Sequence, residues 1–124
     1  MKTYKMVING TEVRCDVNTM GDDICVLLYG GDLPHIGSTA LSVPRPSLTG
    51  EGISATTSIL NCIGHKDDVL AKLFAEKIAA KTNHVTVCVC GVHVDQLSFE
   101  DLQMLYDGCY QFLEDISHSF NLKE

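Results

Sequence analysis

Residues 24–29 read Ile-Cys-Val-Leu-Leu-Tyr, an unbroken apolar run that ends at Gly30-Gly31. A strand that is solvated on one face alternates apolar and polar residues, whereas a strand buried on both faces can be apolar throughout. The run therefore predicts a central strand, and the glycine pair predicts a sharp turn directly after it. Residues 85–90 read Val-Thr-Val-Cys-Val-Cys, with the valines on one face and Cys88 and Cys90 on the other, and predict a second strand that is buried on both faces.

The residues on either side of the first run extend this sheet. Residues 4–8 and 11–17 alternate in polarity and flank an Asn-Gly pair, which readily adopts the positive φ angles of a two-residue hairpin turn. Further along, residues 39–43 and 57–63 are β-prone. Between them, residues 44–47 read Pro-Arg-Pro-Ser and lack the N–H donors of a regular ladder, so we expect the strand to end there and a loop to follow.

Two helical patterns occupy the second half of the chain. Apolar residues recur at helical spacing within residues 66–82, acidic residues fall in the first turn, and Asn83 is suited to a left-handed cap. Residues 98–101 resemble a capping box that begins a long helix, which Gly108 interrupts. The apolar stripe of that helix consists of Leu102, Leu105, Tyr106, Cys109, Leu113, Ile116 and Phe120. This order predicts an α+β fold, an antiparallel sheet with an N-terminal hairpin, covered by two helices.

Size and charge limit the class of protein. A chain of 124 residues with 45% hydrophobic composition can bury one core, so we expect a single domain over residues 1–124. The formal net charge of −7 argues against a nucleic-acid partner, because phosphate binding requires a basic face. No apolar run approaches the roughly 20 residues of a membrane span, and the first residues do not resemble a signal peptide. We therefore expect a soluble cytoplasmic protein.

The cysteine pattern favours reduced thiols in the core. Cys15, Cys25, Cys62, Cys88 and Cys90 all lie in apolar, strand-like runs without the loop spacing of a disulfide framework. A Cys-His hydrolase would need an accessible thiolate in an electropositive niche, which buried thiols do not provide. The histidines are scattered and lack metal-ligand spacing, so the sequence gives a metal site little support as well.

The densest candidate motif is residues 30–37, Gly-Gly-Asp-Leu-Pro-His-Ile-Gly. Its glycines allow a ligand to approach main-chain N–H groups closely, and His35 can donate a hydrogen bond to a phosphate or to a flavin carbonyl. From these residues alone an equally good interpretation is an ordinary loop between strands, whose glycines only permit the turn.

Three further segments hold candidate ligand contacts. His65 and Lys66 stand where a strand meets a helix N-terminus and would strengthen its attraction for anions; the alternative is exposed residues beside a capping aspartate. His93 follows a glycine that can mark a bulge, although a core histidine with its hydrogen bonds satisfied is the commoner case. Arg45 can form a bidentate pair with a phosphate, or it can be exposed without a partner.

Four of these segments together resemble the prenylated-flavin chaperone family, to which the small D subunit of bacterial gallate decarboxylase belongs. They are Gly30–Gly37, Pro44–Ser47, Gly64–Asp67 and Gly91–Asp95, and the resemblance spans roughly Cys25 to Leu102 in the expected order. The family is also similar in fold to eukaryotic proteasome assembly chaperones, which form dimers through their helices. The stripe on the last helix suits such a homodimer, and it suits an intrachain core equally well.

The resemblance implies a chaperone that binds prenylated FMN and assists maturation of a partner decarboxylase of the UbiD type without catalysis of its own. The residues that it suggests for cofactor binding are Gly30, Gly31, Pro34, His35, Ile36, Gly37, Arg45, His65, Lys66 and His93. The main alternative is a protein-assembly module that acts through its helices and needs no small ligand. An enzyme that uses the histidines or a metal is a third hypothesis.

Overall fold

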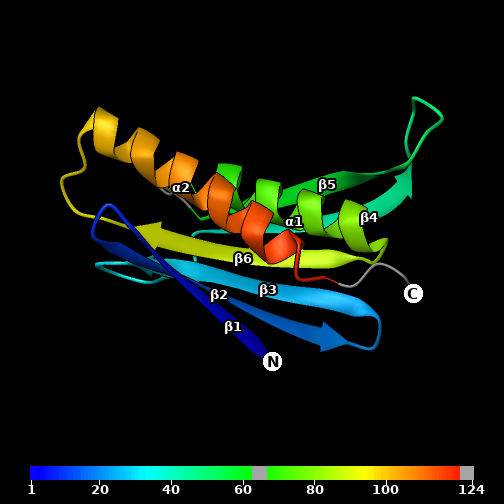
Figure 1. The fold of residues 1–124 in the computed structure, drawn as a ribbon, viewed down its shortest axis with the longest axis horizontal. Helices are drawn as coiled ribbons and strands as arrows, with labels where there is room; N and C mark the ends of the chain where they lie inside the picture. Colours follow the sequence, from blue (N-terminus) through cyan, green and yellow to red (C-terminus); the bar gives the residue numbers. More distant parts are fainter. Residues whose placement is uncertain (63–66, 121–124) are drawn as a thin grey trace.

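The computed structural model describes residues 1–62 and 67–120 and shows one twisted sheet with both helices on the same face (Figure 1). The strands are β1 (Lys2–Ile8), β2 (Thr11–Met20), β3 (Asp23–Gly31), β4 (Ser38–Pro46), β5 (Ile53–Asn61) and β6 (Thr86–His93). The helices are α1 (Asp68–Thr82) and α2 (Phe99–Ser117). The six strands lie in the order β1-β2-β3-β6-β4-β5. The predicted α+β class is confirmed.

Most neighbouring strands are antiparallel, as predicted, and β3 and β6 form a parallel pair. The N-terminal hairpin is confirmed, since β1 pairs with β2 around Asn9 and Gly10, both at positive φ. The left-handed cap at Asn83 is confirmed too, with a φ of 59°. Ser98 accepts a hydrogen bond from the backbone N–H of Asp101, as expected for the start of α2.

The predicted end of β4 is wrong. The strand continues through both prolines to Pro46, and β5 begins at Ile53 instead of residue 57. On its other side β4 pairs with β6 only from Ser38 to Ser42. Pro44 and Pro46 therefore lie beyond the last pair with β6, where the strand has only one neighbour and a missing N–H is tolerated.

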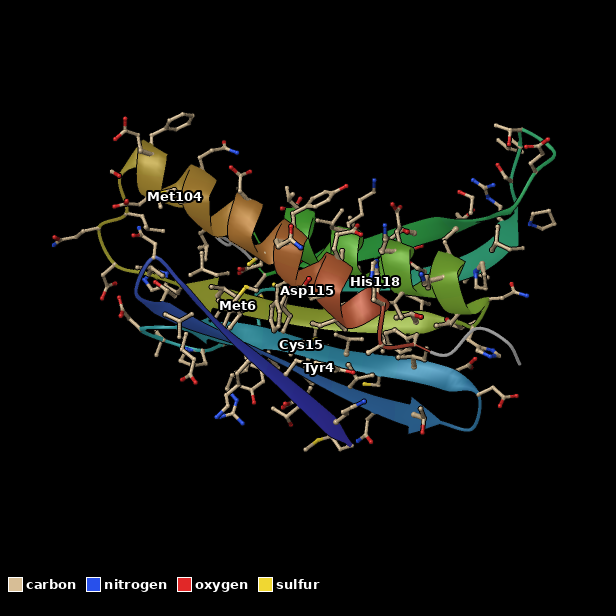
Figure 2. The ribbon with its side chains drawn as sticks, in the orientation of Figure 1. Tyr4, Met6, Cys15, Met104, Asp115 and His118 are labelled. Carbon is tan, nitrogen blue, oxygen red and sulfur yellow. The ribbon has the colours of Figure 1, made fainter. Side chains whose placement is uncertain are left out.

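The core lies between the sheet and the two helices. The alternate residues of the central strands that point toward the helices are fully buried, and they meet the inward faces of α1 and α2. Tyr4, Met6 and Cys15, labelled in Figure 2, belong to this core or pack against it. Leu105, Cys109, Leu113 and Ile116 of the predicted α2 stripe are buried there, and Phe112, which was not assigned to the stripe, is buried beside them. That stripe is therefore intrachain core, the second of the two roles that the sequence allowed.

The opposite face of the sheet corrects a prediction. The central strands were expected to be buried on both faces, but no helix covers this face within the described residues. On it, Leu27 is 40% exposed and Leu41 is 44% exposed, while Val87 and Val89 are half-buried. The apolar residues of the central strands show that this face of the sheet is apolar, but they do not show what packs against it.

The cysteines mostly occupy the predicted environment. All six thiols are free, and Cys15, Cys88, Cys90 and Cys109 are buried. Burial raises the pKa of Cys15 and of Cys109 to about 12, so these thiols stay protonated at neutral pH. The prediction that Cys62 lies in the core is wrong. Its side chain is exposed just after the edge strand β5. Within the described part of the chain, neither helix is long and apolar enough to cross a bilayer.

Candidate functional site

A cleft of about 220 Å³ opens on the helix-bearing side of the molecule, where four segments meet. The loop after β3 supplies His35, the start of α1 supplies Asp67 and Leu70, and the end of β6 supplies Val92, His93 and Val94. The beginning of α2 and the segment before it close the cleft with Leu97, Leu102, Leu105 and Tyr106. Six of the ten lining residues are aliphatic, while polar groups, found at the two histidines, Asp67 and Tyr106 among others, make up about half of the exposed lining.

His35 is held by hydrogen bonds on both sides of its ring. Its Nδ1 lies 2.9 Å from the carbonyl oxygen of Leu33, and its Nε2 lies 3.1 Å from Oδ2 of Asp67. A carbonyl oxygen only accepts hydrogen bonds, so Nδ1 carries a proton in this arrangement. An ionised Asp67 likewise accepts from Nε2, so a ring that carries both protons satisfies both contacts. The side chain of His35 is only 17% exposed.

Asp67 ties the site together. Its Oδ2 faces His35, while its Oδ1 accepts a hydrogen bond of 3.1 Å from the backbone N–H of Val92. The side chain is 9% exposed, and a buried carboxylate requires such partners. The backbone carbonyl of Asp67 also accepts the N–H of Ala71 at the start of α1. One residue therefore connects the loop after β3, the end of β6 and the beginning of α1.

His93 lies beside His35 at the mouth of the cleft. The centroids of the two rings are 6.2 Å apart, and the rings are nearly perpendicular. Nε2 of His93 lies 2.9 Å from Oδ1 of Asp95, and the imidazole is 47% exposed. Asp32 fixes the surrounding backbone, because its N–H donates to the carbonyl of His93 and its carboxylate accepts the N–H of Asp95. The cleft therefore presents two histidines, each paired with a carboxylate.

The glycines of this region allow the protein's own segments to approach closely. A Cβ at Gly37 would collide with the carboxylate of Asp67, and one at Gly91 would collide with the backbone carbonyl of His35. Gly31 has a φ of +80° and lies against the backbone of His93. Gly30 lies against the backbone of Glu12 in β2. These contacts give each glycine a structural role in positioning the histidines, in agreement with the loop interpretation.

Tyr106 supplies the remaining polar group of the cleft. Burial, together with the negative charges of Asp67 and Asp68, raises the pKa of its phenol above the usual value. The hydroxyl consequently stays protonated at neutral pH and can donate a hydrogen bond to a ligand oxygen.

The structure brings only some of the sequence-predicted residues together. His35, His93, Gly31 and Gly37 lie at the cleft, and Gly30 is the last residue but one of β3, the strand that leads to it. Pro34 and Ile36 lie in the same loop with their side chains exposed. Pairing places Ser38 beside Cys90, near the cleft. His65 and Lys66 lie outside the described residues.

Arg45 lies far from the cleft. It is seven residues beyond Ser38 along β4, a distance of about 23 Å in an extended strand. Strand alternation also points its side chain to the face opposite Ser38. There Nε donates to Oγ1 of Thr56 at 2.9 Å, and an η nitrogen donates to the carbonyl of Pro46. One chain does not bring this guanidinium to the histidines.

Sequence reasoning missed the partner of His35 and most of the cleft wall. Asp67 was considered only as a helix cap, because 32 residues separate it from His35 and no spacing rule connects them. Tyr106 and Leu105 appeared only as members of a helix stripe. Their position at the start of α2, near the end of a strand that contains a histidine, was the available signal. Among the described residues, no three His, Cys, Asp or Glu side chains are grouped to bind a metal.

Comparison with known families finds one match. A family model described as the prenylated flavin chaperone LpdD-like domain matches residues 8–121. The matched segment contains nearly all of the chain and every residue of the cleft. No curated protein sequence shows significant similarity to the chain.

Proposed function

The chain belongs to the prenylated flavin chaperone LpdD-like family, and from this premise we propose that it binds prenylated FMN in the cleft at His35. It would then deliver the cofactor to a decarboxylase of the UbiD type in the cytoplasm. The observation that supports this site best is the pair of histidines, whose ring centroids lie 6.2 Å apart beside the aliphatic residues of the cleft.

The walls of the cleft favour the ring system of the cofactor. Prenylated flavin presents a planar aromatic system with an added apolar ring and with carbonyl groups along one edge. Leu70, Val94 and Leu97 offer an apolar surface to the rings, and the protonated Tyr106 offers a donor to a carbonyl. His93, half-exposed at the rim, offers a ring nitrogen and a stacking surface. Pro34 and Ile36 would extend this rim.

The phosphate belongs elsewhere in this proposal. The lining residues that the structure describes include an aspartate and neither lysine nor arginine. They therefore offer an anion no lysine or arginine to pair with. His65 and Lys66, which precede Asp67 in the sequence, remain our candidates for the phosphate contact, whereas Arg45 lies too far along β4 to reach the cleft of its own chain.

The cleft also suits a carrier. Pockets that enclose a drug-sized ligand usually measure about 300–1,000 Å³, so a cleft of about 220 Å³ would leave part of the cofactor uncovered. An uncovered end is accessible to a receiving enzyme. The chaperone family name indicates a role other than catalysis. The buried thiols of Cys15 and Cys109 support the same conclusion, since a protonated thiol is a poor nucleophile.

Titration with prenylated FMN tests the proposal. We expect saturable binding, seen as a change in the flavin absorption spectrum, and weaker binding of unmodified FMN, which lacks the apolar ring. Val94→Trp would fill the cleft and reduce affinity by at least about tenfold, while His35→Ala would reduce it through loss of the rim.

The matched control is His84→Ala, which removes an exposed histidine outside the cleft and should bind normally. Circular dichroism would verify that every variant is folded. A folded wild-type protein that binds neither flavin would overturn the proposal. Equal affinity of Val94→Trp and wild type would place the cofactor at another surface.

A further inference from the structure

The face of the sheet that carries no helix has a continuous apolar band. Leu27 of β3 pairs with Val89 of β6, and Leu41 of β4 pairs with Val87 of β6, so their side chains share this face. Leu27, Leu41 and Val43 are 40%, 44% and 46% exposed. We call these residues, together with Cys25, Val87 and Val89, the apolar band. It runs across three adjacent strands in the middle of the sheet.

The composition of the central strands shows that this band is unusual. An antiparallel sheet with one solvated face normally places polar residues on that face, whereas strands that are apolar on both faces occur where both faces are covered. Residues 24–29 and 85–90 are of the second kind. Contiguous exposed apolar surface on a protein of this size marks an interaction surface.

The two flanks of the band differ in chemistry. On the β2 side, Asp16 is 8% exposed and its Oδ2 accepts the hydroxyl of Tyr29 at 2.8 Å. Its Oδ1 is buried and has no hydrogen-bond partner among the described residues, and the same holds for Nε of Arg14. On the β5 side, strand alternation places the hydroxyls of Thr56 and Ser58 on this face, together with Arg45 of β4, whose Nε donates to Thr56.

We propose that two copies of the chain pack face to face through the apolar band, with the two-fold axis running along β6. This symmetry places β6 of one copy on β6 of the other, and β3 of each copy on β4 of the other. Apolar residues then meet apolar residues in both halves of the interface. The β2 flank meets the β5 flank, so the groups that lack partners lie on the side of the interface that carries the hydroxyls of β5.

The dimensions of the sheet suit a stable dimer. The five strands that overlap in this arrangement, β2 to β6, are spaced about 4.8 Å apart and are about nine residues long, so they present a face of about 700 Å². A standard interface buries about 800 Å² on each partner. Two twisted sheets commonly pack face to face at about 10 Å with their strands roughly aligned. The proposal does not depend on cofactor binding, because the cleft lies on the opposite side of the sheet.

Opposite charges introduced on β3 and β4 test the arrangement. We expect the wild-type protein to be a dimer at micromolar concentration by sedimentation equilibrium. Leu27→Lys alone or Leu41→Glu alone would bury an unpaired charge and raise the dissociation constant by about a hundredfold or more. Mixing the two variants would restore a dimer that contains one chain of each kind, because β3 of one lies on β4 of the other. Native mass spectrometry would identify that mixed dimer.

The control is Leu48→Lys, an equally apolar residue that is 90% exposed in the turn between β4 and β5, outside the band. It should leave the dimer intact. Unchanged circular dichroism and melting temperature would show that the band variants are folded, and either variant alone suffices if the other does not fold. A monomeric wild-type protein would overturn the proposal, and so would a dimer that both band variants leave intact. Loss of decarboxylase capture with an unchanged oligomeric state would assign the face to the enzyme instead.

Discussion

At the scale of single residues, Asp67 has the largest structural role in the cleft. Both of its carboxylate oxygens are used, one by the ring of His35 and one by the backbone of Val92. Removing the carboxylate, which is only 9% exposed, would take an acceptor from two groups at once, which destabilises a protein more than loss of an exposed contact does.

We expect Asp67→Ala to lower the free energy of unfolding by about 2–3 kcal/mol, because a buried N–H and an imidazole lose their acceptor. Chemical denaturation measures this change. Asp95→Ala is the matched control. It breaks the contact between Asp95 and His93, but the aspartate side chain is 71% exposed, so the change should stay below about 1 kcal/mol. Equal losses in the two variants would show that Asp67 is not the structural centre of the site.

At the scale of elements, the contact between α2 and β1 explains a feature that looked unfavourable in the sequence. Gly108 interrupts the stripe of α2, and glycine weakens a helix interior. In the structure, a Cβ at this position would collide with the side chain of Ile8. The glycine lets the helix lie directly on the end of β1, where Ile8 is 7% exposed.

Gly108→Ala tests this interpretation, because its effect on stability should have opposite signs with and without the Ile8 side chain. Helix propensity alone favours alanine by about 1 kcal/mol, whereas overpacking against Ile8 costs about 1–3 kcal/mol. We therefore expect a net loss of stability in the wild-type background, measured by thermal or chemical unfolding. In an Ile8→Ala background the collision is absent, and the same substitution should stabilise the protein. If Gly108→Ala increased stability in both backgrounds, the Ile8 side chain would have moved aside without a cost in free energy.

The elements that local chemistry specifies were predictable. The Asn-Gly turn, the cap at Asn83 and the start of α2 at Ser98 each depend on a few neighbouring residues, and all three are confirmed. The end of β4 was not predictable in this way. Whether a strand tolerates Pro44 depends on whether a neighbour pairs with it at that point, and β6 stops pairing at Ser42.

The site shows the same division. His35 and His93 could be identified because glycines beside each of them marked unusual backbone. Their proximity, and the position of Asp67 between two segments, depends on the order of strands in the sheet. Arg45 shared a plausible motif with them, but the length of β4 and the alternation of its side chains carry it to the other face.

At the scale of the whole molecule, the sheet separates two surfaces. The cleft lies on the helix-bearing face, and the apolar band lies on the other. In the arrangement that we propose, dimer formation would leave both cofactor clefts facing outward, where a receiving enzyme can approach them. The two copies also repel each other electrostatically, because each carries a formal charge of −7.

We expect the dimer to become tighter as salt is added. Two acidic chains repel each other over about 30 Å at 0.01 M ionic strength but over only about 8 Å at 0.15 M. The apolar band itself has no ion pair for salt to weaken. Sedimentation equilibrium at the two ionic strengths should therefore show a several-fold fall in the dissociation constant.

The mixed dimer of Leu27→Lys with Leu41→Glu is the control for this salt effect. Its introduced ion pair is screened by salt, so added salt weakens one contact while it reduces the general repulsion. Its dissociation constant should fall less than that of the wild type. A wild-type dimer that loosens in salt would mean that ionic contacts hold the two chains together, and the apolar band could not then be the principal interface.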